Sequence, residues 1–356
     1  MTTRPLFAKM FMQTCAKGRS MSVSIKDIAK AAGVSHSTVS RALRHSPLIS
    51  EETGDRIRRL AAEMGYVPSA IARGLVTQST RTIGLVVTTI ADPFVAEIVR
   101  GVEEVALDHG YSVFLCNSNA QPQREIATVR ILRENRVDGV IVTSSRVGNL
   151  YLPMLEEMKV PIVLINNQRA GQYVWSVATD NVHGGRLATE YLIELGHKSI
   201  GYLGGSPEVS SNRDRLQGYK QALKTHGIQY DSRLVIKGNG RMEGGQRGVE
   251  ELLALSQPPT AIFCYNDMTA IGALRALREA KIRVPQDMSV IGFDDIALAA
   301  YVEPPLTTVA QAKHEMGQLA MRMLLALLAG EKEVHNIMLQ GKLIVRASCC
   351  PMQTNY

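Results

Sequence analysis

The apolar positions of residues 24–43 recur every three or four residues, which is the spacing of one face of an α-helix. The inward positions of two short helices are Ile25, Ile28, Ala29 and Ala32 in the first, and Val39 and Leu43 in the second. Gly33 supplies the left-handed residue that ends the first helix, and Ser35 is placed to N-cap the second. The pattern therefore predicts two helices joined by a tight turn.

The polar positions of the second helix face outward and form a short ridge, His36, Ser37, Ser40 and Arg41. A helix-turn-helix that lays its second helix in the major groove of DNA needs small residues at the turn, an apolar inner face and polar residues near the start of that helix. A helical hairpin with a solvated face has the same spacing, so the pattern alone leaves both interpretations open.

Net charge favours the first of these interpretations. Residues 1–81 hold 13 Lys and Arg against 5 Asp and Glu, whereas residues 82–356 hold 27 against 28. A basic segment on a near-neutral body is typical of a protein that binds a polyanion. A membrane surface is also anionic, but neither helix combines a strongly apolar face with flanking aromatic residues. Double-stranded DNA is therefore the predicted partner.

A third helix is predicted from its N-cap Ser50 to about Met64. Its inward residues are Ile57, Leu60, Ala61 and Met64, and its outward residues are Arg56, Arg58 and Arg59. The short segment 69–75 follows, in which Gly74 disfavours a helix by about 1 kcal/mol. Because so brief a helix is marginal alone, we expect this segment to be disordered until a partner holds it.

From Ile83 onward, short apolar runs alternate with stretches of helical length. The predicted strands are 83–87, 113–115, 139–142, 162–165, 200–203, 261–264 and 289–291. The predicted helices between and after them are 93–109, 123–135, 150–157, 184–195, 213–226, 244–255 and 268–280. Such alternation predicts parallel β-sheets covered by helices on both faces.

Polar side chains follow the ends of several predicted strands: Asp92, Asn117, Thr143, Asn166, Asn167, Asn266, Asp267, Asp294 and Asp295. Ligands in parallel sheets bind at the carboxyl ends of the strands. Any single Asn or Asp could instead cap the helix that follows it. Their recurrence on several strands, with Arg215 on a helix between them, favours a shared polar cleft.

The length of 356 residues predicts two or three domains, and no apolar run reaches the ~18 residues of a membrane span. The cysteines Cys15, Cys116, Cys264, Cys349 and Cys350 have no metal-ligand spacing. We therefore expect a cytoplasmic protein without metal or cofactor. Cys349 and Cys350 are adjacent, which leaves a vicinal disulfide or simple packing near the chain end as alternatives.

Residues 1–21 are basic and carry a broken apolar patch. Lys9 interrupts the apolar stretch of about 7–15 residues that a signal peptide needs. We expect either an unstructured tail or a start codon upstream of the natural one at Met21.

Short motifs in this chain resemble, in the same order, those of the lactose-repressor and galactose-repressor family of bacterial transcription regulators. The matching motifs are Ile28-Ala29, Gly33-Val34-Ser35, Thr38-Val39-Ser40-Arg41, Gly65-Tyr66-Val67-Pro68, Asp92-Pro93-Phe94, Gly139-Val140-Ile141, Leu195-Gly196-His197, Arg215-Leu216-Gln217-Gly218, Asn266-Asp267, Val284-Pro285, Ile291-Gly292-Phe293-Asp294-Asp295 and Pro304-Pro305-Leu306-Thr307-Thr308. The resemblance covers essentially the whole chain from Met21.

This resemblance implies an all-α helix-turn-helix DNA-binding domain followed by an α/β domain of two lobes, similar to periplasmic sugar-binding proteins, with parallel sheets and three chain crossings. The implied segments are a headpiece at 22–67, a hinge helix and linker at 68–81, and an effector-binding and dimerisation domain at 82–356. Lobe 1 would comprise about 82–180 and 310–333, and lobe 2 about 181–309 and 334–356.

On the DNA side, the resemblance implies that His36 and Ser37, with Arg41 one turn on, read bases. Ser35, Thr38 and Ser40 are expected to be phosphate contacts or caps, and Leu75 to be a wedge in the minor groove. Gly54 departs from the family, in which a long polar or basic residue is usual, and this puts one DNA-backbone contact in doubt.

On the effector side, the implied residues are Asp92, Phe94, Thr143, Asn166, Arg215, Asn266, Asp294 and Gln311. Carboxylates and amides that bond vicinal hydroxyls, with an aromatic side chain under an apolar sugar face, suit a small polyol. Arg215 also leaves a sugar acid or a purine-like corepressor open, because a guanidinium binds carboxylates and phosphates as well. Trp175 is placed either on a ligand or at the lobe junction.

The predicted function is a DNA-binding repressor whose affinity for a pseudo-palindromic operator is changed by a sugar or sugar derivative. A homodimer is expected, because the chain end has no leucine heptad for tetramerisation. The alternative is a sugar receptor or an α/β enzyme with an incidental basic domain. The sequence has no nucleophile elbow, P-loop or glycine-rich dinucleotide turn, so we expect no enzymatic activity.

Overall fold

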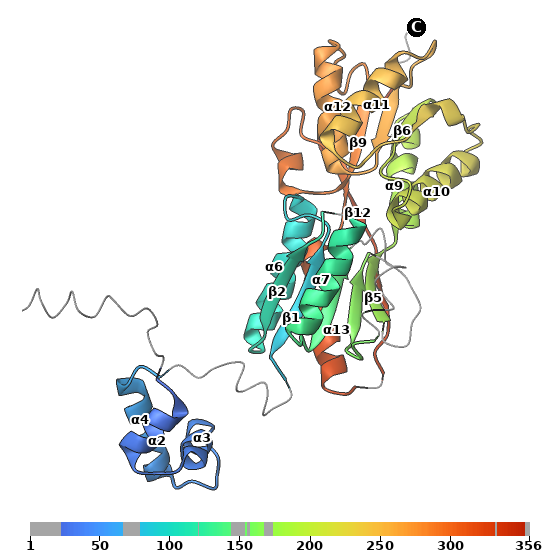
Figure 1. The fold of residues 1–356 in the computed structure, drawn as a ribbon. Coiled ribbons are helices and arrows are strands. Elements are labelled where there is room, and N and C mark those ends of the chain that lie inside the picture. Colours follow the sequence, from blue (N-terminus) through green and yellow to red (C-terminus); the bar gives the residue numbers. More distant parts are fainter. Residues whose placement is uncertain are drawn as a thin grey trace, which may run out of the picture. The chain divides into compact units, whose positions relative to one another are not determined.

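The computed structural model describes residues 23–66, 79–119, 121–143, 154, 157–166, 174–331 and 333–352. The chain divides into two compact units, Met1–Gln78 and Ser79–Tyr356, whose elements are labelled in Figure 1. Several sequence predictions lie outside the described residues: the tail 1–21, most of the segment 68–81 with Leu75, Asn167, and most of the helix 150–157.

The first unit contains the helices α2 (Ile25–Ala32), α3 (His36–Leu43) and α4 (Glu51–Glu63). Their inward faces meet in one apolar cluster, in which Ile28, Val39 and Ile57 are fully buried. Gly33 ends α2 with a φ of 67°, which confirms the predicted turn between α2 and α3. Three short helices around one small core are therefore the fold of this unit.

Two of these helices begin with serine caps. The Ser24 hydroxyl accepts the backbone N–H of Asp27, and the Asp27 carboxylate accepts the backbone N–H of Ser24, so α2 starts with a reciprocal capping box. Ser50 occupies the N-cap position of α4, as predicted, but its hydroxyl donates to Thr53 Oγ1 at 2.9 Å and caps no backbone N–H.

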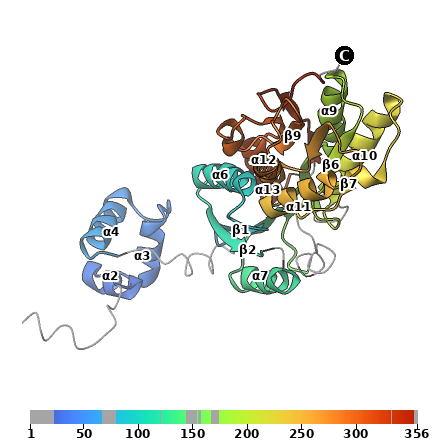
Figure 2. The same ribbon diagram turned by 90° about the horizontal axis from the view of Figure 1, so that it is seen from above.

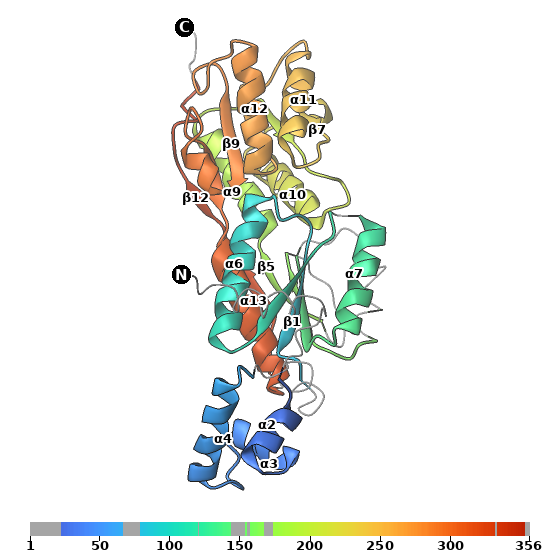
Figure 3. The same ribbon diagram turned by 60° about the vertical axis from the view of Figure 1, so that its left-hand side comes forward.

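The second unit contains two six-stranded sheets, and the first has the strand order β11-β5-β4-β3-β1-β2 with all neighbours parallel. Its strands are β1 (Thr82–Val87), β2 (Ser112–Asn117), β3 (Gly139–Thr143), β4 (Ile162–Ile165), β5 (Val174–Thr179) and β11 (Ile337–Leu339). The helices α6 (Pro93–Asp108) and α13 (Lys313–Leu328) cover one face, and α7 (Pro122–Glu134) covers the other (Figure 3).

The second sheet has the order β12-β10-β9-β8-β6-β7, in which only the β10–β12 pair is antiparallel. Its strands are β6 (Ile200–Leu203), β7 (Val235–Ile236), β8 (Ala261–Cys264), β9 (Ser289–Asp294), β10 (Thr307–Ala310) and β12 (Lys342–Ile344). The helices α9 (Asn181–Glu194) and α10 (Ser210–Thr225) lie on one face, and α11 (Met242–Leu253) and α12 (Asp267–Glu279) on the other (Figure 2).

The strands β1, β3, β4, β6 and β8 are almost wholly apolar and buried because helices cover both faces of the sheets. In β1, Leu85 packs on the side of α6 and α13, whereas the next residue, Val86, packs with Leu132 of α7. Burying one such side chain contributes about 1.5–3 kcal/mol. The prediction of parallel sheets with helices on both faces is confirmed.

The chain passes between the two sheets three times, before α9, before α13 and between β11 and β12. The last crossing differs from the predicted lobe boundary, which assigned residues 334–356 to lobe 2. Ile337–Leu339 forms β11 and pairs with β5 of the first sheet, so the crossing comes after Leu339. This strand has three residues and is only half-buried, which leaves little pattern to detect.

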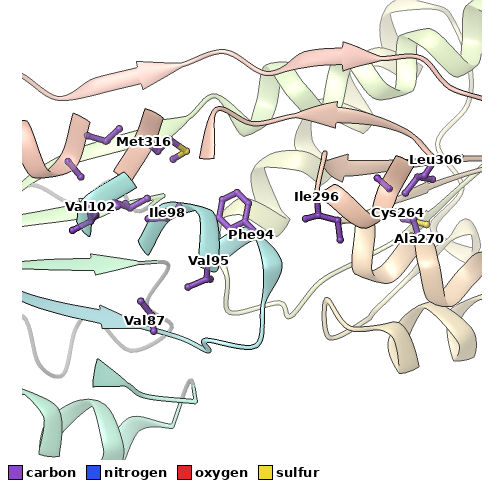
Figure 4. Close-up of a cluster of buried hydrophobic side chains, with 14 of the residues drawn as sticks. Val87, Phe94, Val95, Ile98, Val102, Cys264, Ala270, Ile296, Leu306 and Met316 are labelled. Carbon is purple, nitrogen blue, oxygen red and sulfur yellow. The ribbon is translucent and has the colours of Figure 1, made fainter. Parts of the chain in front are cut away.

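One apolar cluster includes side chains from both lobes, among them Phe94 and Ile98 of α6, Met316 of α13, and Cys264 and Ile296 of the second lobe (Figure 4). Across the described ranges, no helix is long and apolar enough to cross a membrane. Cys349 and Cys350 are free thiols that donate to the carbonyls of Val290 and Pro285, so the vicinal disulfide is absent.

Candidate functional site

The exposed face of α3 carries the polar residues that the sequence predicts to contact DNA. His36, Ser37 and Arg41 are exposed. No residue in the described part of the chain forms a hydrogen bond or ion pair with the side chain of His36 or Arg41. Both side chains are therefore accessible to a ligand of the headpiece.

The remaining hydroxyls of this region bond to one another. Ser35 caps α3, as predicted, because its hydroxyl accepts the backbone N–H of Thr38 at 3.1 Å. The same hydroxyl lies 2.7 Å from Ser37 Oγ and 2.9 Å from Thr38 Oγ1. Ser40 is half-buried, and its hydroxyl accepts a hydrogen bond from Arg44 at 2.9 Å.

Arg58 departs from its predicted outward position, because it is half-buried and joins two helices. Its Nη1 donates to the carbonyl of Ala42 at 2.9 Å, and Asp55 holds its Nη2 at 2.6 Å. Gly54 lies under this guanidinium: a Cβ there would stand 2.9 Å from Arg58 Nη1. Arg58 thus ties α4 to the last turn of α3, where a cation also suits the helix dipole.

The second unit holds a cavity of about 630 Å³ at the carboxyl ends of its strands. Seven of the eight predicted effector residues line it, namely Asp92, Phe94, Asn166, Arg215, Asn266, Asp294 and Gln311. The eighth, Thr143, is buried and donates its hydroxyl to the carbonyl of Val86, and it is not among the residues that line the cavity. The predicted polar cleft therefore exists, with one residue wrongly placed in it.

Capping and cavity lining coincide at two of these residues. Asp92 Oδ1 accepts the backbone N–H of Phe94 at 2.9 Å and caps α6. Asn266 Oδ1 accepts the backbone N–H of Thr269 at 2.9 Å and caps α12. The two interpretations of the strand-end residues are therefore compatible, because each side chain caps a helix and also lines the cavity.

Arg215 is the centre of the polar network in this cavity and is only 3% exposed. Its Nε donates to Asn181 Oδ1 at 2.9 Å, and its Nη1 donates to the carbonyl of Tyr265 at 2.5 Å. The guanidinium carbon lies 3.6 Å from the ring centroid of Phe293 and 4.7 Å from that of Tyr265. The side chain is thus fixed by hydrogen bonds in its plane and by two aromatic rings.

The backbone of Arg215 is placed by a close approach of α9 and α10. A Cβ on Gly185 of α9 would lie 2.3 Å from the carbonyl oxygen of Arg215, a separation that no side chain tolerates. Glycine at this position therefore lets the two helices pack closely enough for the guanidinium to enter the cavity.

Asp294 faces Arg215 from the end of β9. Its Oδ1 lies 3.5 Å from Arg215 Nη1 and accepts a hydrogen bond from Gln311 Nε2 at 2.6 Å. Gln311 Oε1 in turn accepts from Asn166 Nδ2 at 3.4 Å. The chain from Asn166 through Gln311 to Asp294 links the end of β4 in the first sheet with the end of β9 in the second.

The ionised form of Asp294 is disfavoured by the fold. Burial raises the pKa of its carboxyl to about 6, because desolvation outweighs the opposing effect of Arg215, and Asp92 raises it further. Asp267 lies behind it, fully buried, and accepts hydrogen bonds from the backbone of Ile296 and the hydroxyl of Thr308. Burial and the nearby Asp294 raise the pKa of Asp267 as well.

Several lining residues were not predicted from the sequence. Tyr265 directly follows β8 and is the residue before Asn266, so the rule that polar residues gather at strand ends could have found it. Asn239, Arg241 and Glu243 also line the cavity. They follow β7, which has only two residues and gives no detectable strand signal.

Three further residues that the sequence analysis considered for the cavity do not line it. Trp175 lies near the start of β5, pairs with Val163 and packs against the apolar cluster that includes side chains of both lobes, so it does not line the cavity. Asn117 accepts the backbone N–H of Asn119, and Asn119 lines the cavity instead. Asp295 bonds to Arg346 at 2.7 Å rather than entering the cavity.

Comparisons with known proteins agree with this geometry. A family model described as bacterial regulatory proteins, lacI family, matches residues 24–69, and a periplasmic binding protein-like domain model matches residues 189–349. The HTH-type transcriptional repressor CytR of Escherichia coli K12 is 38% identical over 318 residues, which are 89% of this chain and 93% of CytR. The repressor PurR of Vibrio atlanticus is 37% identical over 303 residues, which are 85% of this chain and 91% of PurR.

Solved structures agree as well. The lac repressor dimer bound to operator and the anti-inducer ONPF superposes with a TM-score of 0.83 at 28% identity, and the alignment covers 92% of this chain and 99% of that one. The complex of the transcriptional regulator CelR with cellobiose superposes with a TM-score of 0.71 at 34% identity, with the same coverage of both chains.

A three-helix unit of helix-turn-helix type, followed by a two-sheet unit with a polar cavity at its strand ends, defines a ligand-controlled DNA-binding regulator. The chain belongs to the LacI family of bacterial regulatory proteins, as its motifs predicted. It is a transcriptional repressor whose DNA binding is under the control of a small effector.

Proposed function

We propose that this repressor binds a pseudo-palindromic operator as a homodimer and that a sugar or sugar derivative, held in the cavity around Arg215, changes its operator affinity. The observation that supports the DNA-binding part most directly is α3, whose inner face is buried while His36 and Arg41 are exposed and unpaired within the described residues. A two-fold operator matches the relative whose structure is described as a dimer bound to operator.

Within the headpiece, Arg41 is the proposed base-reading residue, because a guanidinium chelates the edge of a guanine and discriminates by about 1–3 kcal/mol. His36 and Ser37 are proposed to contact bases beside it. Ser35, Thr38 and Ser40, whose hydroxyls already bond within the headpiece, are assigned to phosphate contacts and capping. Leu75, proposed as a minor-groove wedge, lies outside the described residues.

The effector part of the proposal is supported by the cavity, which is rich in hydrogen-bonding groups and large enough for one or two sugar rings. The related structures contain cellobiose in one case and ribose in another. Because the relatives are transcriptional regulators, we assign no enzymatic activity to the chain. Its target is chromosomal DNA, so we place its action in the bacterial cytoplasm.

A selection experiment tests the proposal. Full-length protein is used to enrich double-stranded DNA from a random library, and the enriched sequences are then titrated at fixed ionic strength with and without sugars. We expect two half-sites related by two-fold symmetry, and a shift in affinity with an active sugar by 5–150-fold, about 1–3 kcal/mol. Failure to enrich any symmetric sequence would contradict the proposal.

Two arginine variants separate base reading from charge. Arg41→Ala is expected to weaken binding to the selected operator by at least about tenfold while changing binding to random DNA far less. Arg59→Ala removes the same charge from the exposed side of α4 and is expected to weaken both kinds of binding alike. Equal loss of specificity in the two variants would show that Arg41 does not read a base.

A further inference from the structure

Among the described residues that line the cavity, negatively charged side chains outnumber positively charged ones. The carboxylates of Asp92, Glu243 and Asp294 line it, against the guanidinium groups of Arg215 and Arg241. Asp92 and Asp294 line the same cavity, and the charge of Asp92 raises the pKa of Asp294. A further anion would add a third negative charge to this pair.

Most nitrogen atoms of the buried Arg215 guanidinium already form hydrogen bonds within the protein. Arg215 uses its Nε on Asn181 and its Nη1 on the carbonyl of Tyr265, with Asp294 at 3.5 Å. Within the described ranges, only its Nη2 has no hydrogen-bond partner. A carboxylate or phosphate binds arginine tightly through two parallel N–H donors, and here one of the two is already in use.

Asp294 offers a free acceptor beside this donor. Its Oδ1 accepts from Gln311, whereas its Oδ2 has no partner among the residues that the structure describes, although the side chain is more than nine-tenths buried. A hydroxyl group can donate to Oδ2 and accept from Arg215 Nη2 at the same time. An anionic oxygen can accept but cannot donate, and it is repelled by the carboxylate.

The helix N-termini at the cavity do not offset its excess of negative charge. The N-termini of α6, α10, α11 and α12 all contribute lining residues, and such ends favour anions. Asp92, Glu243 and Asp267 stand at the starts of α6, α11 and α12, and Glu208 directly precedes the N-cap of α10. An acidic residue of the chain itself therefore stands at or next to each of these four ends in the sequence.

We infer that the effector of this repressor is an uncharged polyhydroxyl compound, and that the cavity discriminates against sugar acids and sugar phosphates of the same shape. The discrimination arises from Asp294 and Asp92 and from the engagement of Arg215 within the protein. This inference rests on the proposed function, namely that the cavity binds a sugar or sugar derivative.

Matched pairs of probes test the inference on the full-length protein. Each pair has one carbon skeleton and differs in charge: ribose with ribose 5-phosphate, glucose with glucuronate, cellobiose with cellobionate, and a nucleoside with its monophosphate. The melting temperature is measured with each probe at pH 7.5, and Kd is determined for every probe that raises it. We expect the uncharged member of a pair to bind at least about tenfold more tightly, which is 1.4 kcal/mol.

The possible results separate the inference from the proposed function. Binding of a charged member as tight as that of its neutral partner, or tighter, would overturn the inference and leave the proposed function intact. If no probe binds in any pair, the sugar-effector part of the proposed function fails, and the inference fails with it. Operator selection is independent of this result, so repression itself is tested separately.

Two matched variants locate the source of the discrimination. Asp92→Asn removes a cavity charge but keeps the carbonyl oxygen that caps α6, so we expect the ratio of the two Kd values in a pair to fall at least about threefold. Asp108→Asn removes the same charge at the other, exposed end of α6 and is expected to leave the ratio unchanged. An equal fall in both variants, or none in Asp92→Asn, would contradict the assignment to the cavity carboxylates.

Discussion

At the residue scale, Asp294 is a hydrogen-bond acceptor of the cavity whose ionised form is disfavoured by burial. Burial removes water from its carboxylate, and the attraction of Arg215 at 3.5 Å does not compensate, so the pKa of Asp294 rises to about 6. A neutral amide at this position would cost the fold less. The ionised carboxylate is therefore best explained by a ligand that donates hydrogen bonds to it.

The replacement Asp294→Asn is predicted to stabilise the protein against unfolding and to weaken effector binding. Because the pKa of Asp294 is higher in the folded protein than in the unfolded one, its contribution to stability is fully present below about pH 4 and is lost as pH rises to about 6. Asp294→Asn escapes this loss. We expect it to be more stable than the wild type by roughly 2–3 kcal/mol above pH 6, and about equally stable near pH 4.

Thermal or urea unfolding between pH 4 and pH 8 measures this difference. In the same variant, affinity for an uncharged effector should fall at least about tenfold, because an amide cannot replace a charged acceptor. Asp108→Asn, on the exposed end of α6, serves as the control and should show no such dependence on pH. A variant that loses stability at pH 8 would show that the ion pair with Arg215 outweighs the cost of burial.

At the scale of the elements, the recognition helix α3 is held by arginines rather than by a large core. Arg44 donates to the carbonyl of Ser40, and Arg58 donates from α4 to the carbonyl of Ala42. Arg44 and Arg58 therefore bond to the protein itself, although charge counting alone would assign them to DNA. Gly54 leaves room for the Arg58 guanidinium over α4.

The pair of Gly54 and Arg58 gives a prediction in the form of a double-mutant cycle. Gly54→Ala alone gains helix propensity but pushes the guanidinium away from Ala42, so we expect little net change. In an Arg58→Ala background the same substitution should stabilise the headpiece by about 1 kcal/mol. Arg58→Ala alone should destabilise it by about 1 kcal/mol.

Hydrogen exchange of α3 and α4 in the full-length protein measures these differences, with the helices of the second unit as internal controls. The coupling between the two positions should be about 0.5–1 kcal/mol. Additive effects would mean that the Arg58 guanidinium does not occupy the space above Gly54. The helix-propensity cost of Gly54 in α4 would then stand without compensation.

The elements also show where sequence patterns suffice and where they do not. All seven predicted strands are present, because runs of three to five consecutive β-branched or apolar residues leave a clear pattern, most of all in the strands that are buried on both faces. Five strands were missed. The strands β7, β11 and β12 have two or three residues and are half-buried or exposed. The strands β5 and β10 are longer and mostly buried, but serine and threonine residues interrupt their apolar runs. Their positions follow from pairing with distant strands, which no local pattern records.

The same limit applies to the cavity. Asp294 ends β9, and Asn266 and Asp92 lie in the segments that follow β8 and β1, so topology alone predicts that the three meet. The stacking of Phe293 on Arg215 could not be predicted, since Phe293 lies inside β9 and its alternation suggests only a core residue. The packing of α10 against the sheet decides that the guanidinium meets this ring.

At the scale of the whole molecule, one carboxylate holds the segment through which the second unit connects to the chain before it. Asp138 accepts the backbone N–H of Thr80 at 2.8 Å and that of Arg81 at 3.0 Å, and it also accepts the hydroxyl of Ser79 at 2.5 Å. The second unit thus begins at Ser79, before the boundary predicted at residues 81 and 82. Any effect of the cavity on the headpiece through the chain has to pass this point.

We therefore predict that Asp138 transmits the effector signal without contributing to effector binding. Asp138→Ala should leave the Kd for the effector within about twofold, because the side chain is absent from the cavity lining. The change in operator affinity that the effector causes, expected at 5–150-fold, should fall by at least about threefold, because residues 79–81 lose their common acceptor. Operator titrations with saturating effector and without it measure the ratio of the two operator affinities.

Asp108→Ala, an exposed substitution on α6, should keep the wild-type ratio. An unchanged ratio in Asp138→Ala would mean that the signal reaches the headpiece by contacts other than this anchored segment.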